Sequence, residues 1–149
     1  MMDSLQELYQ EVILDHNRRP RNFRAIAAAT RQEGYNPLCG DRLVVYVVVE
    51  DGVVRDVAFE GAGCAIAKAS ASLMTEALRG KPVAAARQLF AEFRDMVTAP
   101  PSEPARDLGK LTALAGVREF PTRVKCASLA WHAVNAALDG AATAPVSTE

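Results

Sequence analysis

The chain has 149 residues, of which half are hydrophobic and 23% are charged, a composition typical of one globular domain. Its 17 basic and 18 acidic side chains leave a net charge of −1, which excludes the basic excess of a general nucleic-acid binder. The longest apolar run, residues 43–49, is far shorter than the roughly 20 residues that a membrane-spanning helix needs. The first residues do not read as a secretory signal, and the three cysteines are an odd number. We therefore expect a cytoplasmic protein that binds neither membrane nor nucleic acid.

In chain order, residues 5–17 carry apolar side chains at three- and four-residue steps, which predicts a helix that ends before Pro20. A short strand is expected at 32–35. Two stronger strands, 43–50 and 53–59, flank Asp51-Gly52, a typical hairpin turn. The first is almost entirely apolar, so we expect it at the centre of the sheet. Gly61 and Gly63 should end the second strand.

The remaining pattern is helical. Helices are expected at 64–79, with Gly80 as the stop, at 83–96, at 108–114 and at 122–138. Prolines 100, 101 and 104 mark an exposed connection. This order predicts an α+β fold. We expect one domain over residues 1–140 and a disordered tail over 141–149.

All three cysteines lie at the edges of predicted elements. Cys39 stands two residues before Asp41, Cys64 follows a Gly-rich turn at a helix start, and Cys126 opens the last helix. A helix N-terminus favours a thiolate, as do positive neighbours such as Lys125. Thiolates together with a carboxylate suit zinc. Any one cysteine taken alone reads better as an inert, buried, small hydrophobic residue, and no CxxC pair anchors a site.

Several segments in combination resemble the SufU branch of the IscU/NifU-N-terminal family of iron–sulfur assembly proteins. They are 8-LYQEVILDH-16, 20-PRNF-23, 36-NPLCGD-41, 59-FEGAGCAI-66, 69-ASAS-72 and 123-RVKC-126, and the likeness runs from about residue 5 to 138. Asn17, Arg24 and Ala67 depart from common family residues, which leaves partner details open.

The resemblance implies an α+β fold in which a small antiparallel β-sheet packs against several helices on one face. It also implies that one zinc ion is bound by Cys39, Asp41, Cys64 and Cys126. Lys125 stands where IscU-type scaffolds usually carry His, and residues 96–117 look like the insertion of the SufU branch. Both features favour a zinc-dependent sulfurtransferase that accepts persulfide sulfur from a SufS-like cysteine desulfurase, a pyridoxal-phosphate enzyme, and passes it toward a downstream iron–sulfur scaffold.

Within that interpretation, Cys39 is the sulfur acceptor by resemblance to the family. Arg123 is a residue for docking or for supporting the site, although an ordinary surface charge at a helix start explains it equally well from the sequence. The runner-up function is a scaffold that assembles a [2Fe–2S] cluster on the same ligands, because thiolates do not separate zinc from such clusters. A structural zinc protein is a third class. His16 and His132 are not expected to bind the metal.

Overall fold

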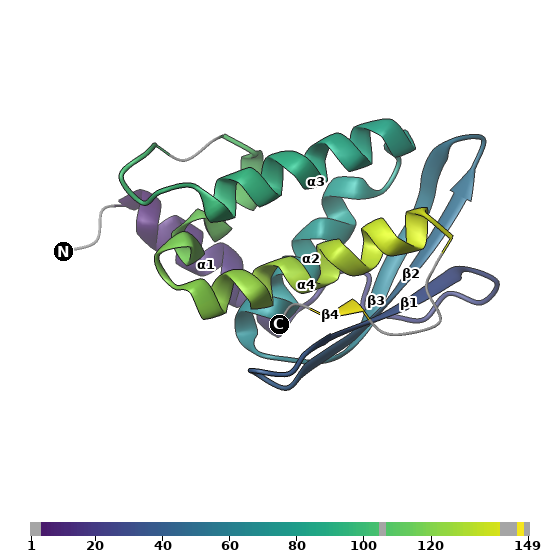
Figure 1. The fold of residues 1–149 in the computed structure, drawn as a ribbon, viewed down its shortest axis with the longest axis horizontal. Coiled ribbons are helices and arrows are strands. Elements are labelled where there is room, and N and C mark those ends of the chain that lie inside the picture. The colour runs from purple at the N-terminus through teal and green to yellow at the C-terminus, as the bar shows by residue number, and fades with distance from the viewer. Residues whose placement is uncertain (1–3, 105–106, 141–145, 148–149) are drawn as a thin grey trace.

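The computed structural model describes residues 4–104, 107–140 and 146–147. Its elements, in chain order, are α1 (Ser4–Arg18), β1 (Thr30–Asn36), β2 (Asp41–Glu50), β3 (Val53–Ala62), α2 (Ala65–Leu78), α3 (Val83–Thr98), the 3₁₀ helix η1 (Gly109–Glu119), α4 (Pro121–Leu138) and β4 (Val146–Ser147). Helices and sheet form two layers, with the helices on one face of the sheet (Figure 1). The expected α+β fold is confirmed. No helix among the described ranges is long and apolar enough to cross a membrane.

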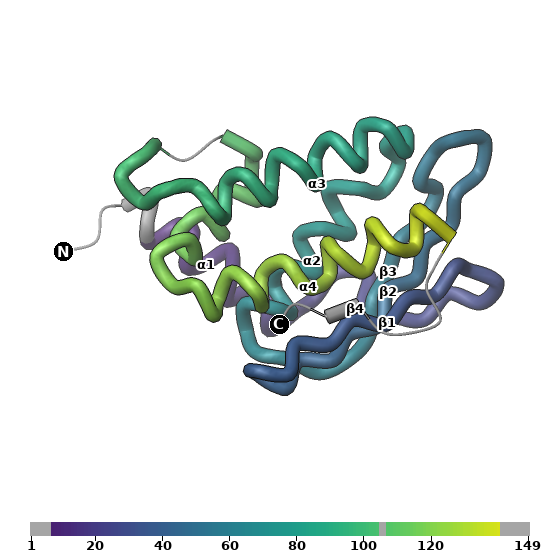
Figure 2. The backbone as a smooth tube through the Cα atoms, in the orientation of Figure 1, coloured from purple at the N-terminus to yellow at the C-terminus, as the bar shows by residue number. Residues whose placement is uncertain are grey.

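The sheet has the strand order β3-β2-β1-β4. β2 pairs antiparallel with both β1 and β3, so the nearly all-apolar strand lies inside the sheet as expected. Asp51 and Gly52 both have positive φ angles, as a two-residue hairpin turn requires. The backbone path in Figure 2 places this hairpin beside the start of α3, where the N–H of Val83 donates to the carbonyl oxygen of Gly52 at 2.9 Å.

Alternation along the strands decides which side chains face the helices. Leu43, Val45 and Val47 of β2 are buried, and they pack with residues of α4 such as Leu129 and Trp131 in one core. In β1 the same alternation buries every second residue from Gln32 through Asn36. The same alternation turns the side chains at the end of β1 and the start of β2 toward α4, where the candidate site lies.

Two sequence-based expectations need correction. β3 does not end at Gly61 but continues to Ala62, because Gly61 adopts φ +132° and keeps the strand paired with β2 at Leu43. The short helix expected at 108–114 is the 3₁₀ helix η1, which reaches Glu119. Of the tail at 141–149, residues 141–145 and 148–149 lie outside the described part of the chain, and Val146–Ser147 pair with β1.

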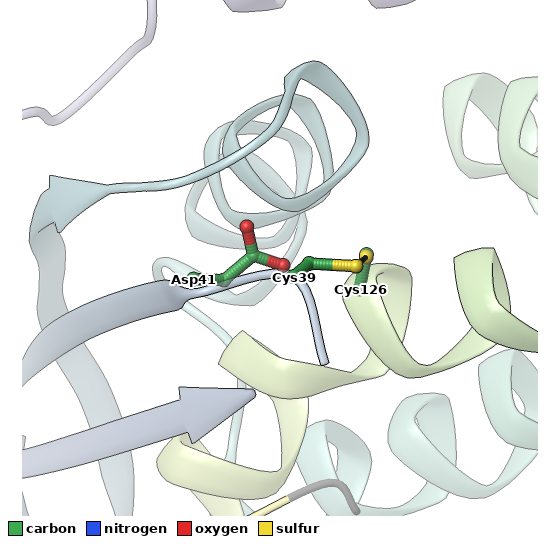
Figure 3. Close-up of side chains that lie close together, drawn as sticks. All are labelled: Cys39, Asp41 and Cys126. Atoms are coloured by element: carbon green, nitrogen blue, oxygen red, sulfur yellow. Dashed lines mark hydrogen bonds between the residues drawn. The ribbon is translucent and has the colours of Figure 1, made fainter. Parts of the chain in front are cut away.

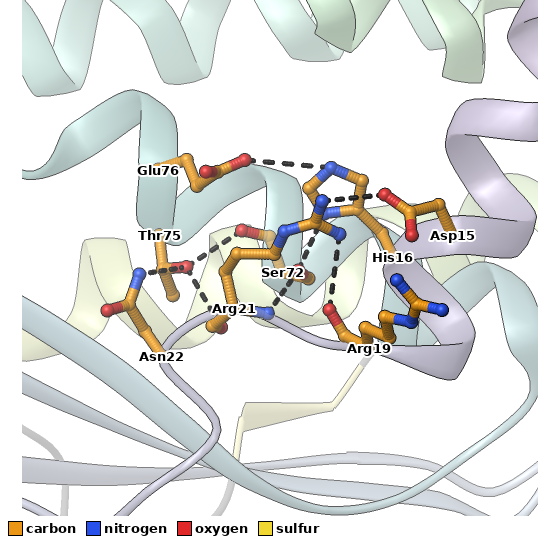
Figure 4. Close-up of polar contacts among 8 residues, drawn as sticks. All are labelled: Asp15, His16, Arg19, Arg21, Asn22, Ser72, Thr75 and Glu76. Carbon is orange, nitrogen blue, oxygen red and sulfur yellow. Dashed lines mark hydrogen bonds and ion pairs between the residues drawn. The ribbon is translucent and has the colours of Figure 1, made fainter.

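The connection after α1 is fastened to α2 by a polar network around His16 (Figure 4). The backbone N–H of Arg21 donates to Ser72 Oγ at 2.8 Å, and Ser72 Oγ lies 2.7 Å from His16 Nδ1. The Ser72 hydroxyl can donate its proton to Nδ1 while its oxygen accepts the Arg21 N–H. Nε2 faces Glu76 Oε1 at 3.6 Å. His16 therefore has a structural role in this network.

His16 should make the free energy of unfolding depend on pH. Burial, followed by the nearby Arg21 charge and with a smaller contribution from Lys110, lowers the pKa of His16, while Glu76 and Asp15 oppose the shift. As pH falls below about 6.5, the unfolded chain takes up the proton first, so stability present above that pH is lost on acidification. We expect urea denaturation of the metal-free protein between about pH 7.5 and 5.5 to show this loss, and His16→Gln to flatten it.

His132→Gln is the matched control for this experiment, because burial and Arg94 also lower the pKa of His132. Each substitution should remove its own share of the pH dependence. An unchanged slope in His16→Gln would contradict the assignment to the network.

Candidate metal centre

Cys39 lies in the tight turn that joins β1 to β2. The N–H of Gly40 donates to the carbonyl oxygen of Asn36 at 2.8 Å, which closes the turn, and the Cys39 side chain is exposed. Cys39 therefore precedes β2, the strand that Asp41 opens. The turn, rather than a shared pleat, brings its sulfur over the end of β2.

Asp41 opens β2 on the same face as Leu43 and is completely buried. Its Oδ1 accepts the backbone N–H of Cys64 at 2.8 Å, which fixes the direction of the carboxylate. Gly63 allows this approach, since a Cβ there would lie 3.1 Å from Asp41 Oδ1. None of the ion pairs within the described residues includes Asp41. A buried carboxylate without a cation is unfavourable, which points to a missing positive partner.

Cys64 is the N-cap of α2. Its Sγ accepts the N–H of Ala67 at 3.4 Å. Ser, Thr, Asn or Asp usually occupies this N-cap position and makes the equivalent hydrogen bond. The predicted helix thus begins one residue later than expected. The thiol is half-buried, and Cys64 Sγ lies 3.8 Å from Asp41 Oδ2.

Cys126 is buried in α4, and this helix brings its thiol to the ends of the two strands. Its Sγ lies 3.3 Å from Cys39 Sγ. One ligand atom from each of Cys39, Asp41 and Cys126 falls within 4.8 Å of the others (Figure 3). The structure thus gathers three of the four predicted ligands into a compact cluster, with Cys64 beside it through Asp41.

Burial raises the pKa of the Cys126 thiol strongly, and its hydrogen bonds with Cys39, Asp41 and Cys64 act in the same direction. The expectation that Lys125 favours a Cys126 thiolate is therefore wrong for the metal-free protein. A dication in the cluster would reverse this balance, because a coordinated thiol loses its proton.

The donor set fits zinc. Three thiols and one carboxylate approach from a turn, a strand end and two helices, which allows four donors around one centre. Soft thiolates exclude magnesium or calcium as the natural occupant, whereas iron–sulfur clusters share the same ligand preference.

Asn36 is a site residue to which sequence reasoning assigned no role. It is fully buried, and its Nδ2 lies 3.4 Å from Asp41 Oδ2 and 3.5 Å from Cys126 Sγ. The available signal was its place at the start of the 36–41 segment, which also carries Cys39 and Asp41.

The other predicted residues lie outside the cluster. Arg123 is exposed at the start of α4, with its guanidinium 4.6 Å above the Phe120 ring. His132 is half-buried, with its ring against Phe90, and His16 is bound in the α1–α2 network. Neither histidine belongs to the metal cluster identified among the described residues.

Comparison with known proteins agrees with this geometry. The NifU-like N-terminal domain matches residues 8–139. The zinc-dependent sulfurtransferase SufU of Bacillus subtilis is 40% identical over 131 residues, covering 88% of this chain and 89% of that protein. The iron–sulfur cluster assembly scaffold protein IscU of Streptococcus pyogenes is 36% identical over 143 residues, covering 96% of this chain and 90% of that protein.

Among solved structures, SufU of Fervidobacterium islandicum, described as a cluster assembly scaffold for the SUF system, has a TM-score of 0.79 at 31% identity. The likeness covers 89% of this chain and 98% of that one. The family match over residues 8–139 spans the positions of all four candidate ligands. The chain belongs to the NifU-like N-terminal domain family, as the motifs around its cysteines predicted.

Proposed function

We propose that this protein works in iron–sulfur cluster assembly as a zinc-dependent sulfur acceptor for a cysteine desulfurase. The partner is a SufS-like pyridoxal-phosphate enzyme, and the sulfur passes on toward a cluster scaffold in the cytoplasm. Two facts support the proposal: a 40%-identical relative is named a zinc-dependent sulfurtransferase, and a compact cluster of thiols and a carboxylate lies on the corresponding fold.

The proposal rests on the difference in solvent exposure between Cys39 and the candidate ligands Asp41 and Cys126. Cys39 is exposed on a surface turn, while Asp41 and Cys126 are buried behind it. A persulfide on another protein can reach the Cys39 sulfur without disturbing the core. A structural zinc site needs only to hold its four ligands, whereas a sulfur acceptor must present one thiol to its partner.

Cys39, Asp41, Cys64 and Cys126 would hold the metal. When bound, zinc keeps these thiols deprotonated at neutral pH without redox chemistry of its own. The Cys39 thiolate attacks the outer sulfur of the donor persulfide; a new S–S bond forms on Cys39 as the donor's S–S bond breaks. The donor cysteine leaves as a thiolate, so no oxidant or reductant is consumed.

We assign docking to Arg123. Its guanidinium stands free of any ion pair found among the described residues, on the rim of a groove of about 260 Å³ lined by apolar side chains that include Ile13, Ile66 and Val117. Ile66 and Arg123 each lie within three residues of a candidate ligand, so a partner seated there would also cover the cluster.

Cys64→Ser should separate metal binding from folding. Serine is a good N-cap, so the hydroxyl can keep the bond from the Ala67 N–H, and the metal-free protein should unfold within about 0.5 kcal/mol of wild type. Loss of one of four ligands should weaken zinc binding by roughly two orders of magnitude. Competition with a chromophoric chelator measures this affinity. Unchanged affinity would remove Cys64 from the ligand set.

The test of function is alanine formation from cysteine by the source organism's desulfurase, run anaerobically with and without the zinc-loaded protein. A large increase in turnover, absent with metal-free protein, is expected. No increase with a competent desulfurase would overturn sulfur transfer. A brown protein that assembles iron and sulfide on the same thiols would then favour the scaffold function named for the IscU relatives.

A further inference from the structure

One buried amide connects three of the four segments that carry the candidate ligands. Asn36 ends β1 directly opposite Asp41 in the strand register, on the helix-facing side of the sheet. Its Oδ1 accepts the N–H of Leu38 at 3.2 Å, inside the turn that presents Cys39. Its Nδ2 faces Asp41 Oδ2 and Cys126 Sγ.

The chemistry of the neighbours determines the orientation of the amide. The backbone N–H of Leu38 can only donate, so the group facing it must be the amide oxygen. The carboxylate of Asp41 and the sulfur of Cys126 are acceptors, so they require the NH₂ group. Rotating the amide by half a turn would leave all three contacts mismatched in a site without water-facing space, since Asn36 is 0% exposed.

The three thiols differ in the N–H groups that reach them. Cys126 Sγ accepts from the Asn36 amide and Cys64 Sγ from the Ala67 backbone. Among the hydrogen bonds of the described residues, none is donated by an N–H to Cys39 Sγ. An N–H donor withdraws electron density from a thiolate, which weakens it as a nucleophile and holds it in place as a ligand.

We propose that Asn36 is a positioning residue: by donating to Cys126 and Asp41 it keeps both in the metal site, and so makes Cys39 the thiol that is released to react. This deepens the proposed sulfur transfer, because it names the group that selects the acceptor. The amide oxygen adds to the effect by fixing the turn on which Cys39 is exposed.

The test uses zinc-loaded protein and a limiting amount of iodoacetamide, with alkylation rates at each cysteine followed by peptide mass spectrometry. Wild type should react first at Cys39. In Asn36→Ala the rate at Cys126 should rise about tenfold, the order of the change expected when a charge-assisted hydrogen bond is lost. Gln32→Ala is the matched control, since Gln32 is another buried β1 amide, with its Nε2 donating to the carbonyl oxygen of Glu33.

Asn36→Ser separates the two halves of the side chain. The serine oxygen can still accept the Leu38 N–H in the turn, but it is too short to donate to Cys126. In this variant the Cys39 rate should equal the wild-type value, while the Cys126 rate should be raised as in Asn36→Ala. A serine variant that matches wild type at Cys126 would reduce Asn36 to a turn residue and overturn the proposal.

Cobalt(II) in place of zinc gives a readout that altered access alone would not move. Loss of the N–H donor should shift the thiolate-to-cobalt charge-transfer band to lower energy in both Asn36 variants, and not in Gln32→Ala. A raised Cys126 rate without a band shift would mean only easier access and would also overturn the proposal. Neither measurement uses a desulfurase, so a failure here is distinct from a failure of sulfur transfer.

Discussion

Replacing Cys39 by serine should abolish the stimulation of the desulfurase, returning alanine formation to the rate without this protein. Serine keeps the shape of the side chain but supplies no sulfur for a persulfide bond. Because Cys39 is exposed and lies in a turn, the free energy of unfolding of the metal-free protein should change by no more than about 0.5 kcal/mol. In wild type, mass spectrometry of the reaction should find one added sulfur atom on the Cys39 peptide.

Cys64→Ser is the matched control, since it too removes one thiolate ligand but leaves the acceptor in place. At zinc concentrations that load both variants, Cys64→Ser should keep part of the stimulation and Cys39→Ser none. Equal loss in the two variants would show that Cys39 acts only as a ligand. Added sulfur on Cys64 or Cys126 in wild type would move the acceptor role to that residue.

Gly61→Ala should destabilise the protein by roughly 3 kcal/mol or more, an effect of the size seen when strain combines with overpacking. Gly61 has φ +132°, which an alanine rarely adopts. A Cβ there would overlap the carbonyl oxygen of Arg42 and lie 2.9 Å from Leu43 Cα, both backbone atoms of β2. Relief would require β2 and β3 to separate next to Asp41, so zinc affinity should fall as well.

Gly80→Ala measures the cost of a positive φ angle alone, without the steric clash that an added Cβ causes at Gly61. Gly80 also has a positive φ, +85°, but an added Cβ would meet nothing within 4 Å. Its substitution should destabilise the protein by only about 1 kcal/mol, the usual cost of a left-handed alanine. Urea denaturation of the metal-free proteins measures both. Equal effects for the two variants would contradict the close approach of the strands at Gly61.

Much of the fold follows from local sequence. The Asp51-Gly52 pair, between two runs rich in valine, is sufficient to predict the hairpin because a two-residue turn needs positive φ at both positions. Periodic apolar residues and the stop signals Pro20 and Gly80 placed the helices to within a few residues. The extent of β3 was not predictable in this way, because a glycine such as Gly61 indicates, from local sequence, that the strand ends. Only the neighbouring strand shows why a glycine continues there.

The sequence by itself also determined the candidate ligands, through the resemblance carried by the short segments around Cys39, Cys64 and Cys126. The spacing of the cysteines alone did not identify the ligands, because Cys39, Cys64 and Cys126 lie 25 and 62 residues apart. No two of them share a turn or a helix. Tertiary structure alone decided which thiol is exposed, that burial raises the pKa of Cys126, and that the Asn36 amide joins β1 to α4. The physical reason is that burial and hydrogen-bond direction depend on segments distant in the chain, which local sequence patterns do not record.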